Sequence, residues 1–309
     1  MTNFTPSFKL LANDKDITAH LQKNLISLSF KDEAGIVSDE ITLEVAGEFK
    51  RPKYQDKLKL WLGYKESGLW YCGCFAVQTS ERTLHTTSIT ATGVDFSGTL
   101  KQRKNRSWEK VSLKEIVEKI AKEHSLSYKA DFGEVKILYA AQHNESDLNF
   151  LKRFAKTHEA IFSVKDNKIL FLRKAESEKL PLARIDLNEV ESFSIKHSNK
   201  TAYASAKAIW HDTKENKIKE VIVGSGEPQL RIEHSFKDSA EAKLRAEAKL
   251  KSANAGIVSG NLTIYGSKIY AGGKLELSNA KEDNGIYHIK SVTHNLSANG
   301  FLTSVEFEK

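Results

Sequence analysis

The sequence has little cysteine: Cys72 and Cys74 are the only two among 309 residues, which also include four prolines and one methionine. Two residues apart in an extended segment, the thiols point the same way, at a separation too long for an unstrained disulfide. Without a further pair of Cys or His ligands they also make a poor zinc site. The sequence therefore predicts buried, inert thiols, no metal site and no disulfide framework, which is typical of a reducing compartment.

Long apolar runs are also missing. None approaches the roughly 18 residues that cross a membrane as a helix. Residues 1–10 lack the basic region and apolar core of a signal peptide. We therefore expect no membrane insertion by this chain and no export by a signal peptide.

Motifs of nucleotide and ester chemistry are absent. The sequence has no Walker motif and no G-x-G-x-x-G pattern, which excludes the common phosphate-binding loops. Gly224-Ser225-Gly226 lacks the strand-to-helix elbow of a hydrolase serine and is interpreted as a turn. No cofactor is predicted.

The net charge of +7 is spread along the chain, and the only dense basic run covers residues 101–106. A nucleic-acid surface would need more such runs, interleaved with exposed aromatic residues. We interpret this run as a solvated linker.

Strand patterns fill the first third of the chain. Apolar and polar residues alternate over 25–30, 41–45 and 57–62, and strands continue over 70–78 and 87–94. Period two with short turns indicates antiparallel strands that bury one face. We predict a first β-barrel over residues 1–104.

Helical signals appear next. Ser112 and Glu115 have the spacing of a capping box, ahead of an apolar stripe over 113–121, and the helix is expected to end near residue 124. Asn144 or Ser146 can cap a second helix that runs to residue 155. Apolar strands over 161–164 and 169–172, joined through Asp166-Asn167, indicate a hairpin. Residues 105–175 are therefore predicted to form an α+β module with two helices and a hairpin.

Strands resume after a linker at 176–181. The strand patterns cover residues 191–197, 202–210, 218–223, 256–265, 274–277, 285–293 and 300–308. A helix near 238–252 is inserted among them, with Asp238 as its cap and Glu241 three residues on. We predict a second β-barrel over 176–309. The fold class is mainly β with an α+β insertion: two tube-like antiparallel β-barrels flank a small α+β module.

One cluster is a candidate for catalysis or metal binding: His143, Glu145, Asp147, His158 and Glu159. Asp147 and His158 are eleven residues apart, which is about 16 Å along a helix axis and too far for one metal. We therefore predict helix capping by the acids, solvated positions for the rest, and no catalytic residue. The four tryptophans could line a glycan groove, but core packing is their commoner role.

Two stretches carry a more specific pattern. The first runs from Gln142 to Ala155, places Glu145-Ser146-Asp147 before an apolar helix with an arginine, and is followed by the 161–172 hairpin. The second joins 285–294 to 300–307. Both resemble the late control protein D family of contractile-tailed phages, which is similar to the hub part of type VI secretion spike proteins. With the barrel–module–barrel order, the resemblance covers nearly the whole chain. The structural signature residues that it implies are Gln142, Glu145, Ser146, Asp147, Phe150, Leu151, Arg153, Gly285, Tyr287, His294, Gly300, Phe301 and Thr303.

The resemblance implies a structural baseplate hub. Three copies would form a pseudo-sixfold ring that joins a hexameric tail tube to a trimeric spike. The implied partners are the other copies of a homotrimer, the tail tube protein, the spike protein and other baseplate proteins, with non-specific proximity to DNA in the lumen. No needle follows Lys309, so the spike is expected to be a separate subunit. The implied location is the virion tail, or a prophage-derived tail-like particle, assembled in the bacterial host cytoplasm. Two alternatives stay open, a peptidoglycan- or glycan-binding module and a cell-wall-degrading enzyme.

Overall fold

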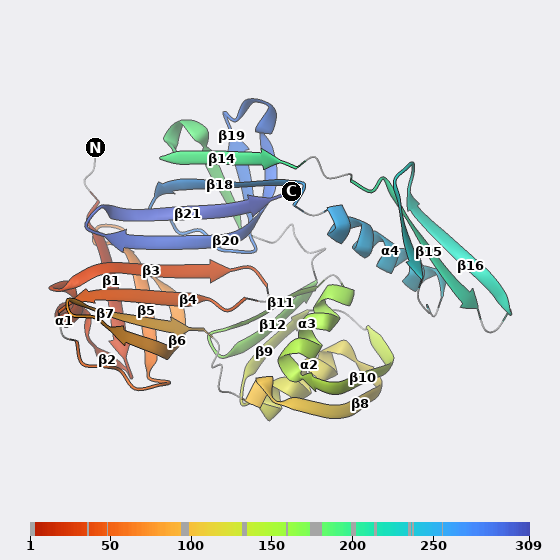
Figure 1. Ribbon diagram of the computed structural model, residues 1–309, viewed down its shortest axis with the longest axis horizontal. Coiled ribbons are helices and arrows are strands. Elements are labelled where there is room, and N and C mark those ends of the chain that lie inside the picture. Colours follow the sequence, from red (N-terminus) through yellow and green to blue (C-terminus); the bar gives the residue numbers. More distant parts are fainter. Residues whose placement is uncertain are drawn as a thin grey trace.

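A computed structural model describes residues 4–309 except 36, 48, 94–98, 132–134, 159, 174–180, 199–201, 213, 214, 234, 235, 237 and 255. We divide these residues into a first β unit (4–93), a middle module (99–173), a last β unit (181–198 and 256–309) and a projecting unit (202–254). Figure 1 shows the two β units side by side, the middle module next to them, and the projecting unit reaching away at the right. Among the described helices, none has the length and hydropathy needed to span a membrane.

The first β unit is antiparallel throughout. Its strands bury alternate residues, as in β4, where Ile41, Leu43 and Val45 face the core and their neighbours do not. The elements are β1 (Pro6–Ala12), β2 (Lys15–Asp16), α1 (Thr18–Gln22), β3 (Leu25–Glu33), β4 (Glu40–Ala46), β5 (Lys57–Tyr64), β6 (Gly68–Arg82) and β7 (Thr86–Thr92).

The last β unit is also largely antiparallel, apart from the parallel pair β13 and β19. Its strands are β13 (Leu182–Asp186), β14 (Ser192–His197), β18 (Val258–Tyr265), β19 (Lys274–Ser278), β20 (Gly285–Ser297) and β21 (Gly300–Glu308).

Among the described strands, one pair joins the two β units. β3 pairs antiparallel with β20, and Phe30 lies opposite His294 in this register. The hydrogen-bonded path therefore runs through one sheet from β14 to β2, and among the described strands no pairing closes either unit into a separate barrel. The predicted fold class, mainly β with an α+β insertion, is confirmed. The two tube-like barrels of that prediction are instead two antiparallel β units that share one sheet.

The middle module contains β8 (Arg103–Ser112), α2 (Leu113–Glu123), β9 (Ser127–Asp131), β10 (Lys136–Ser146), α3 (Asp147–Thr157), β11 (Ala160–Lys165) and β12 (Lys168–Arg173). β8 pairs with β10, and β11, β12 and β9 form a second sheet. The capping box of Ser112 and Glu115 is present, and Ser146 caps α3. The hairpin turn is confirmed, because Asp166 and Asn167 both have positive φ.

The prediction that the strands within residues 202–223 belong to the second β-barrel is wrong. Those strands belong to a separate three-stranded sheet and not to the sheet of the last β unit. Its elements are β15 (Ser205–Asp212), β16 (Lys217–Gly224), β17 (Gln229–Glu233) and α4 (Ser239–Asn254). Asp238 caps α4, as predicted, by accepting the N–H of Glu241 at 2.9 Å. Trp210 and small alanines of β15 and α4 form the core of this unit. Alternation alone does not say which sheet a strand joins.

Cys72 and Cys74 on β6 are only partly buried, so the prediction of buried thiols is wrong in that respect. Burial raises the pKa of Cys72 to about 12, which keeps this thiol protonated and poorly nucleophilic.

Candidate functional site

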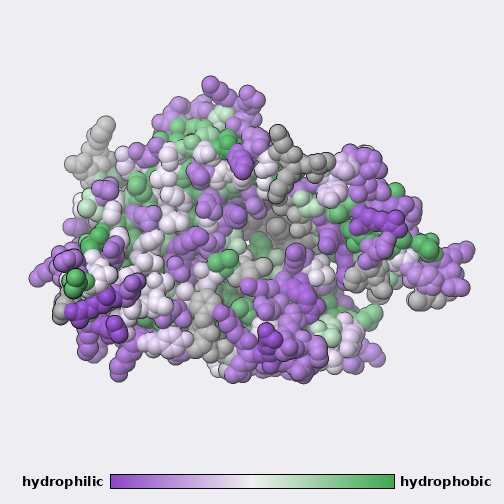
Figure 2. All heavy atoms as spheres, in the orientation of Figure 1, coloured by the Kyte–Doolittle hydropathy of each residue, from purple (hydrophilic) through white to green (hydrophobic). Residues whose placement is uncertain are grey.

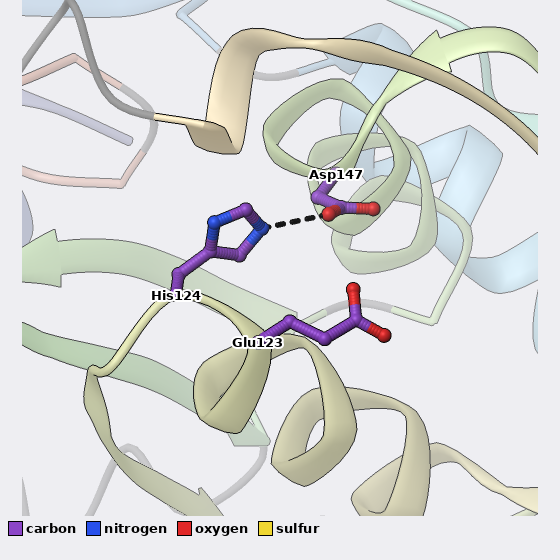
Figure 3. Close-up of side chains that lie close together, drawn as sticks. All are labelled: Glu123, His124 and Asp147. Carbon is purple, nitrogen blue, oxygen red and sulfur yellow. Dashed lines mark hydrogen bonds and ion pairs between the residues drawn. The ribbon is translucent and has the colours of Figure 1, made fainter.

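The predicted signature residue Asp147 is the centre of a buried ion-pair cluster. Its side chain is fully buried at the start of α3. Oδ1 accepts hydrogen bonds from Gln142 Nε2, at 2.7 Å, and from Arg106. Oδ2 accepts from Lys104 Nζ, at 2.6 Å, and from His124 Nε2, at 2.8 Å. Figure 3 shows His124 and Glu123 converging on this carboxylate.

Four elements of the middle module supply the cluster. β8 directs Lys104 and Arg106 inward, because residues two apart share one face of a strand. α2 ends beside them, and its Glu123 pairs with Lys104 at 2.9 Å and with Arg106 at 2.8 Å. β10 contributes Gln142, whose Oε1 accepts from Arg106 Nε at 2.8 Å. The cluster therefore ties both strands of the β8–β10 sheet to both helices of the module.

The cluster is electrically balanced. Burial alone would raise the pKa of Asp147, but hydrogen bonds from Lys104, Gln142 and His124, together with the charge of Arg106, hold this pKa below its usual value. Lys104 and Arg106 likewise lower the pKa of Glu123 against the effect of burial. Two carboxylates thus face two permanent cations, with His124 as a further donor.

Metal binding is the other chemistry open to these groups. Glu123, His124 and Asp147 bring possible ligand atoms within 4.8 Å of one another. However, both carboxylates are already held by Lys104 and Arg106, and a divalent ion would have to displace these cations. The arrangement favours a structural brace over a metal centre.

The basic run at 101–106 was predicted to be a solvated linker, and this is wrong. Residues 103–106 open β8, and Lys104 and Arg106 are the cationic half of the cluster. Asp147 was predicted to cap the helix, but it is buried and held by ion pairs, while Ser146 makes the cap. Sequence reasoning missed Lys104, Arg106 and His124. The signal that could have identified Lys104 and Arg106 is their alternation with Trp108, which places all three on the inward face of one strand.

The other members of the predicted acid and histidine cluster do not converge. Glu145 forms a two-point pair with Arg153, at 3.1 Å and 2.7 Å. His143 is exposed on β10. His158 is the C-cap of α3, at the opposite end of the helix from Asp147. Glu159 lies outside the described residues. Phe150 and Leu151 are fully buried in the core of the module.

The second signature stretch lies where the two β units meet. His294 Nδ1 is 3.0 Å from Thr303 Oγ1, and the His294 ring stacks on Phe30 of the first β unit at 5.7 Å. Phe301 packs into the core of the first β unit, beside Trp70. Tyr287 donates to the carbonyl of Asp283 at 2.8 Å. Gly285 and Gly300 have positive φ at the starts of β20 and β21.

A basic cleft of about 730 Å³ opens beside the N-terminal end of α3. Its described lining includes Lys101, Arg103 and Lys152, with Phe162 and Val164 among its apolar walls. Burial, and then the charge of Lys101, lower the pKa of Lys152. Glu145, the only acid in that lining, is already paired with Arg153. The cleft is suited to an anionic group.

The surface seen in Figure 2 is mostly hydrophilic, with hydrophobic residues in small patches. Some of these patches lie on the projecting unit at the right of the view. Its strand β16 exposes Ile218 and Ile222, at 75% and 52% of their surface.

Comparison with known proteins places this architecture in one family. The sequence profile described as phage tail baseplate hub (GPD) matches residues 76–300. The probable baseplate hub protein of Escherichia phage 186 is 26% identical, in an alignment covering 99% of this chain and 94% of that protein. The corresponding protein of Escherichia phage P2 is 25% identical over the same shares. The chain belongs to the phage tail baseplate hub family, a class of structural tail proteins.

Solved structures share the fold at low sequence identity. A 43 kDa tail protein of prophage MuSo2 from Shewanella oneidensis has a TM-score of 0.73 at 13% identity, and the match covers 98% of both chains. A tail protein from Neisseria meningitidis MC58 has a TM-score of 0.76 at 10% identity, covering 99% of this chain and 97% of the other. The E. coli c3393 protein, a type VI secretion component, has a TM-score of 0.57 at 11% identity, covering 92% of this chain and 73% of the other.

Proposed function

We propose that this baseplate hub protein forms a trimeric ring of pseudo-sixfold symmetry that joins a hexameric tail tube to a trimeric spike. The observation that carries this proposal is the β3–β20 pair, which holds two antiparallel β units side by side in one chain. Three copies of such a chain supply six units, and closed symmetry requires that the same surfaces meet at each repeat.

The edges of the shared sheet support the same proposal. The path ends at β14 on one side and at β2 on the other. Exposed strand edges can pair with a neighbouring chain, and their burial protects against aggregation. In this proposal, neighbouring copies meet through these two ends. The tube and spike subunits meet opposite faces of the ring, and the chain assembles in the host cytoplasm.

The oligomeric state tests this function. Analytical ultracentrifugation of the chain, alone and mixed with tube and spike subunits of the same tail, is expected to give a trimer in at least the mixtures. Electron-microscope class averages of that species are expected to show six similar lobes around a pore. A chain that stays monomeric with both partners present and binds neither would contradict the proposal.

We further propose that the chain has no catalytic step of its own. The balanced Asp147 cluster and the Glu145–Arg153 pair leave no described carboxylate of the signature stretch poised for proton transfer. Incubation of the purified chain with insoluble peptidoglycan is expected to release no soluble fragments. Release that disappears in Glu145→Gln or Asp147→Asn would instead support the enzyme alternative.

A further inference from the structure

A second buried ion cluster lies where three of the structural units meet. Asp32 on β3 and Asp39, just before β4, are 5% and 6% exposed. Lys165, the last residue of β11, contacts Asp32 Oδ1 and lies 3.1 Å from Asp39 Oδ1. The other oxygen of Asp32 accepts the backbone N–H of Ala271 at 2.8 Å. This triad therefore joins the first β unit to the middle module through Lys165 and to the last β unit through Ala271.

The triad carries unbalanced charge. Asp32 and Asp39 are two carboxylates, and Lys165 is one ammonium. The triad lies along a cavity of about 290 Å³. The other titratable side chains described along this cavity are Glu33, Tyr71, Cys72, Cys74, Asp166, Tyr270 and His294.

None of those neighbours supplies a second cation. Burial lowers the pKa of His294 to about 4, so its ring is neutral at physiological pH. Glu33 forms an ion pair with Lys31 at 2.6 Å, and Asp166 accepts a hydrogen bond from the Tyr71 hydroxyl at 2.9 Å. Counted over the described side chains along this cavity, the triad has one negative charge in excess, in surroundings where an uncompensated charge is costly.

Protonation of Asp39 would remove this excess charge without breaking its hydrogen bonds. Its Oδ1 accepts both the N–H of Glu33, at 3.0 Å, and the Lys165 contact. A proton on Oδ2 would leave both contacts in place. Burial raises the pKa of Asp39 to about 6, with the Asp32 charge adding to the rise and Lys165 opposing it.

We propose that Asp32, Lys165 and Asp39 form a proton-dependent lock that fixes the middle module against both β units. Uptake of one proton by Asp39 balances the triad and tightens the joint, and loss of that proton loosens it. The pKa of Asp39 in the folded chain lies above the ordinary value of an aspartate. This stabilisation is therefore complete below about pH 4 and is lost as the pH rises through about 6.

Hydrogen exchange of the β11 amides, corrected for intrinsic chemical rates, tests the lock. If local opening of β11 exposes Asp39 to water and leaves His294 buried on β20, the equilibrium constant for this opening in the wild type is expected to be roughly tenfold larger at about pH 7.5 than at about pH 5. Asp39→Asn mimics the protonated carboxyl and is expected to keep β11 slow at both pH values. Glu40→Gln, which neutralises the exposed neighbouring acid, serves as the matched control and should follow wild type.

Two results would overturn the lock: no pH response of β11 in the wild type, or the same response in Asp39→Asn. A further variant, Lys165→Met, separates a local joint from global stability. It is expected to speed exchange in β11 at about pH 7.5 and to leave α4 unchanged. Equal acceleration in α4 would show global destabilisation and contradict the proposal.

Discussion

His294 on β20 and Thr303 on β21 lie directly opposite each other, with Nδ1 and Oγ1 3.0 Å apart in a buried position. The same Thr303 oxygen accepts the N–H of Ser267 at 3.0 Å. His294 in turn stacks on Phe30 across the β3–β20 joint. This pair therefore positions an uncharged aromatic ring at the contact between the two β units.

The lowered pKa of His294 predicts a pH effect on stability. The unfolded chain binds a proton near the ordinary histidine pKa, while the folded chain resists it until about pH 4. The free energy of unfolding should therefore lose up to about 3 kcal/mol as the pH falls through this interval. The raised pKa of Asp39 changes the free energy of unfolding in the opposite direction. The measurement is therefore urea unfolding of both the wild type and His294→Phe over a range of pH. His294→Phe should lack this loss of stability. If the free energies of unfolding of both proteins change with pH in parallel, the prediction is refuted.

Asp147→Asn should strongly destabilise the middle module. Of the described acids that pair with Lys104 and Arg106, the substitution leaves Glu123 as the one counter-charge in a partly buried site. Breaking a buried pair in this way costs about 3–5 kcal/mol. Urea denaturation measures the change, with Asp131→Asn at an exposed position of β9 as the matched control. Similar stabilities for the two variants would show that the cluster is not a brace.

Glu145→Gln should have a small effect, although Glu145 is only two residues from Asp147. Its partner Arg153 is 48% exposed, and such solvated pairs contribute less than about 1 kcal/mol. Thermal unfolding of Glu145→Gln and Asp147→Asn under the same conditions checks this difference in stability. A loss as large as that of Asp147→Asn would mean that the pair is part of the brace.

Gly260→Ala should destabilise the last β unit through a steric clash. An added Cβ would lie 2.4 Å from Phe307 Cζ and 2.6 Å from the Ser194 carbonyl oxygen, between β14 and β21. Such overpacking costs about 1–3 kcal/mol. Chemical denaturation is the measurement, with Ser259→Ala on the same strand as control. An unchanged midpoint for Gly260→Ala would show that the backbone there can shift freely.

The sequence by itself determined the local structure. Ser112 and Glu115 form the capping box at the predicted spacing, and Asp166-Asn167 turn the predicted hairpin. These features depend on residues a few positions apart, whose geometry is set by the backbone. Alternation likewise identified the buried face of β4. The resemblance of two stretches to a phage tail family added the function, which local patterns do not encode.

Only the tertiary structure decided which of these elements meet. Period two says which face of a strand is buried, but not which strand lies beside it. The β3–β20 joint and the separate sheet of the projecting unit were therefore not predictable from alternation. Lys104 and Asp147, or Asp32 and Lys165, are 43 and 133 residues apart. The sequence does not pair these residues, because the partner of a charged side chain is fixed only when packing removes water from both groups.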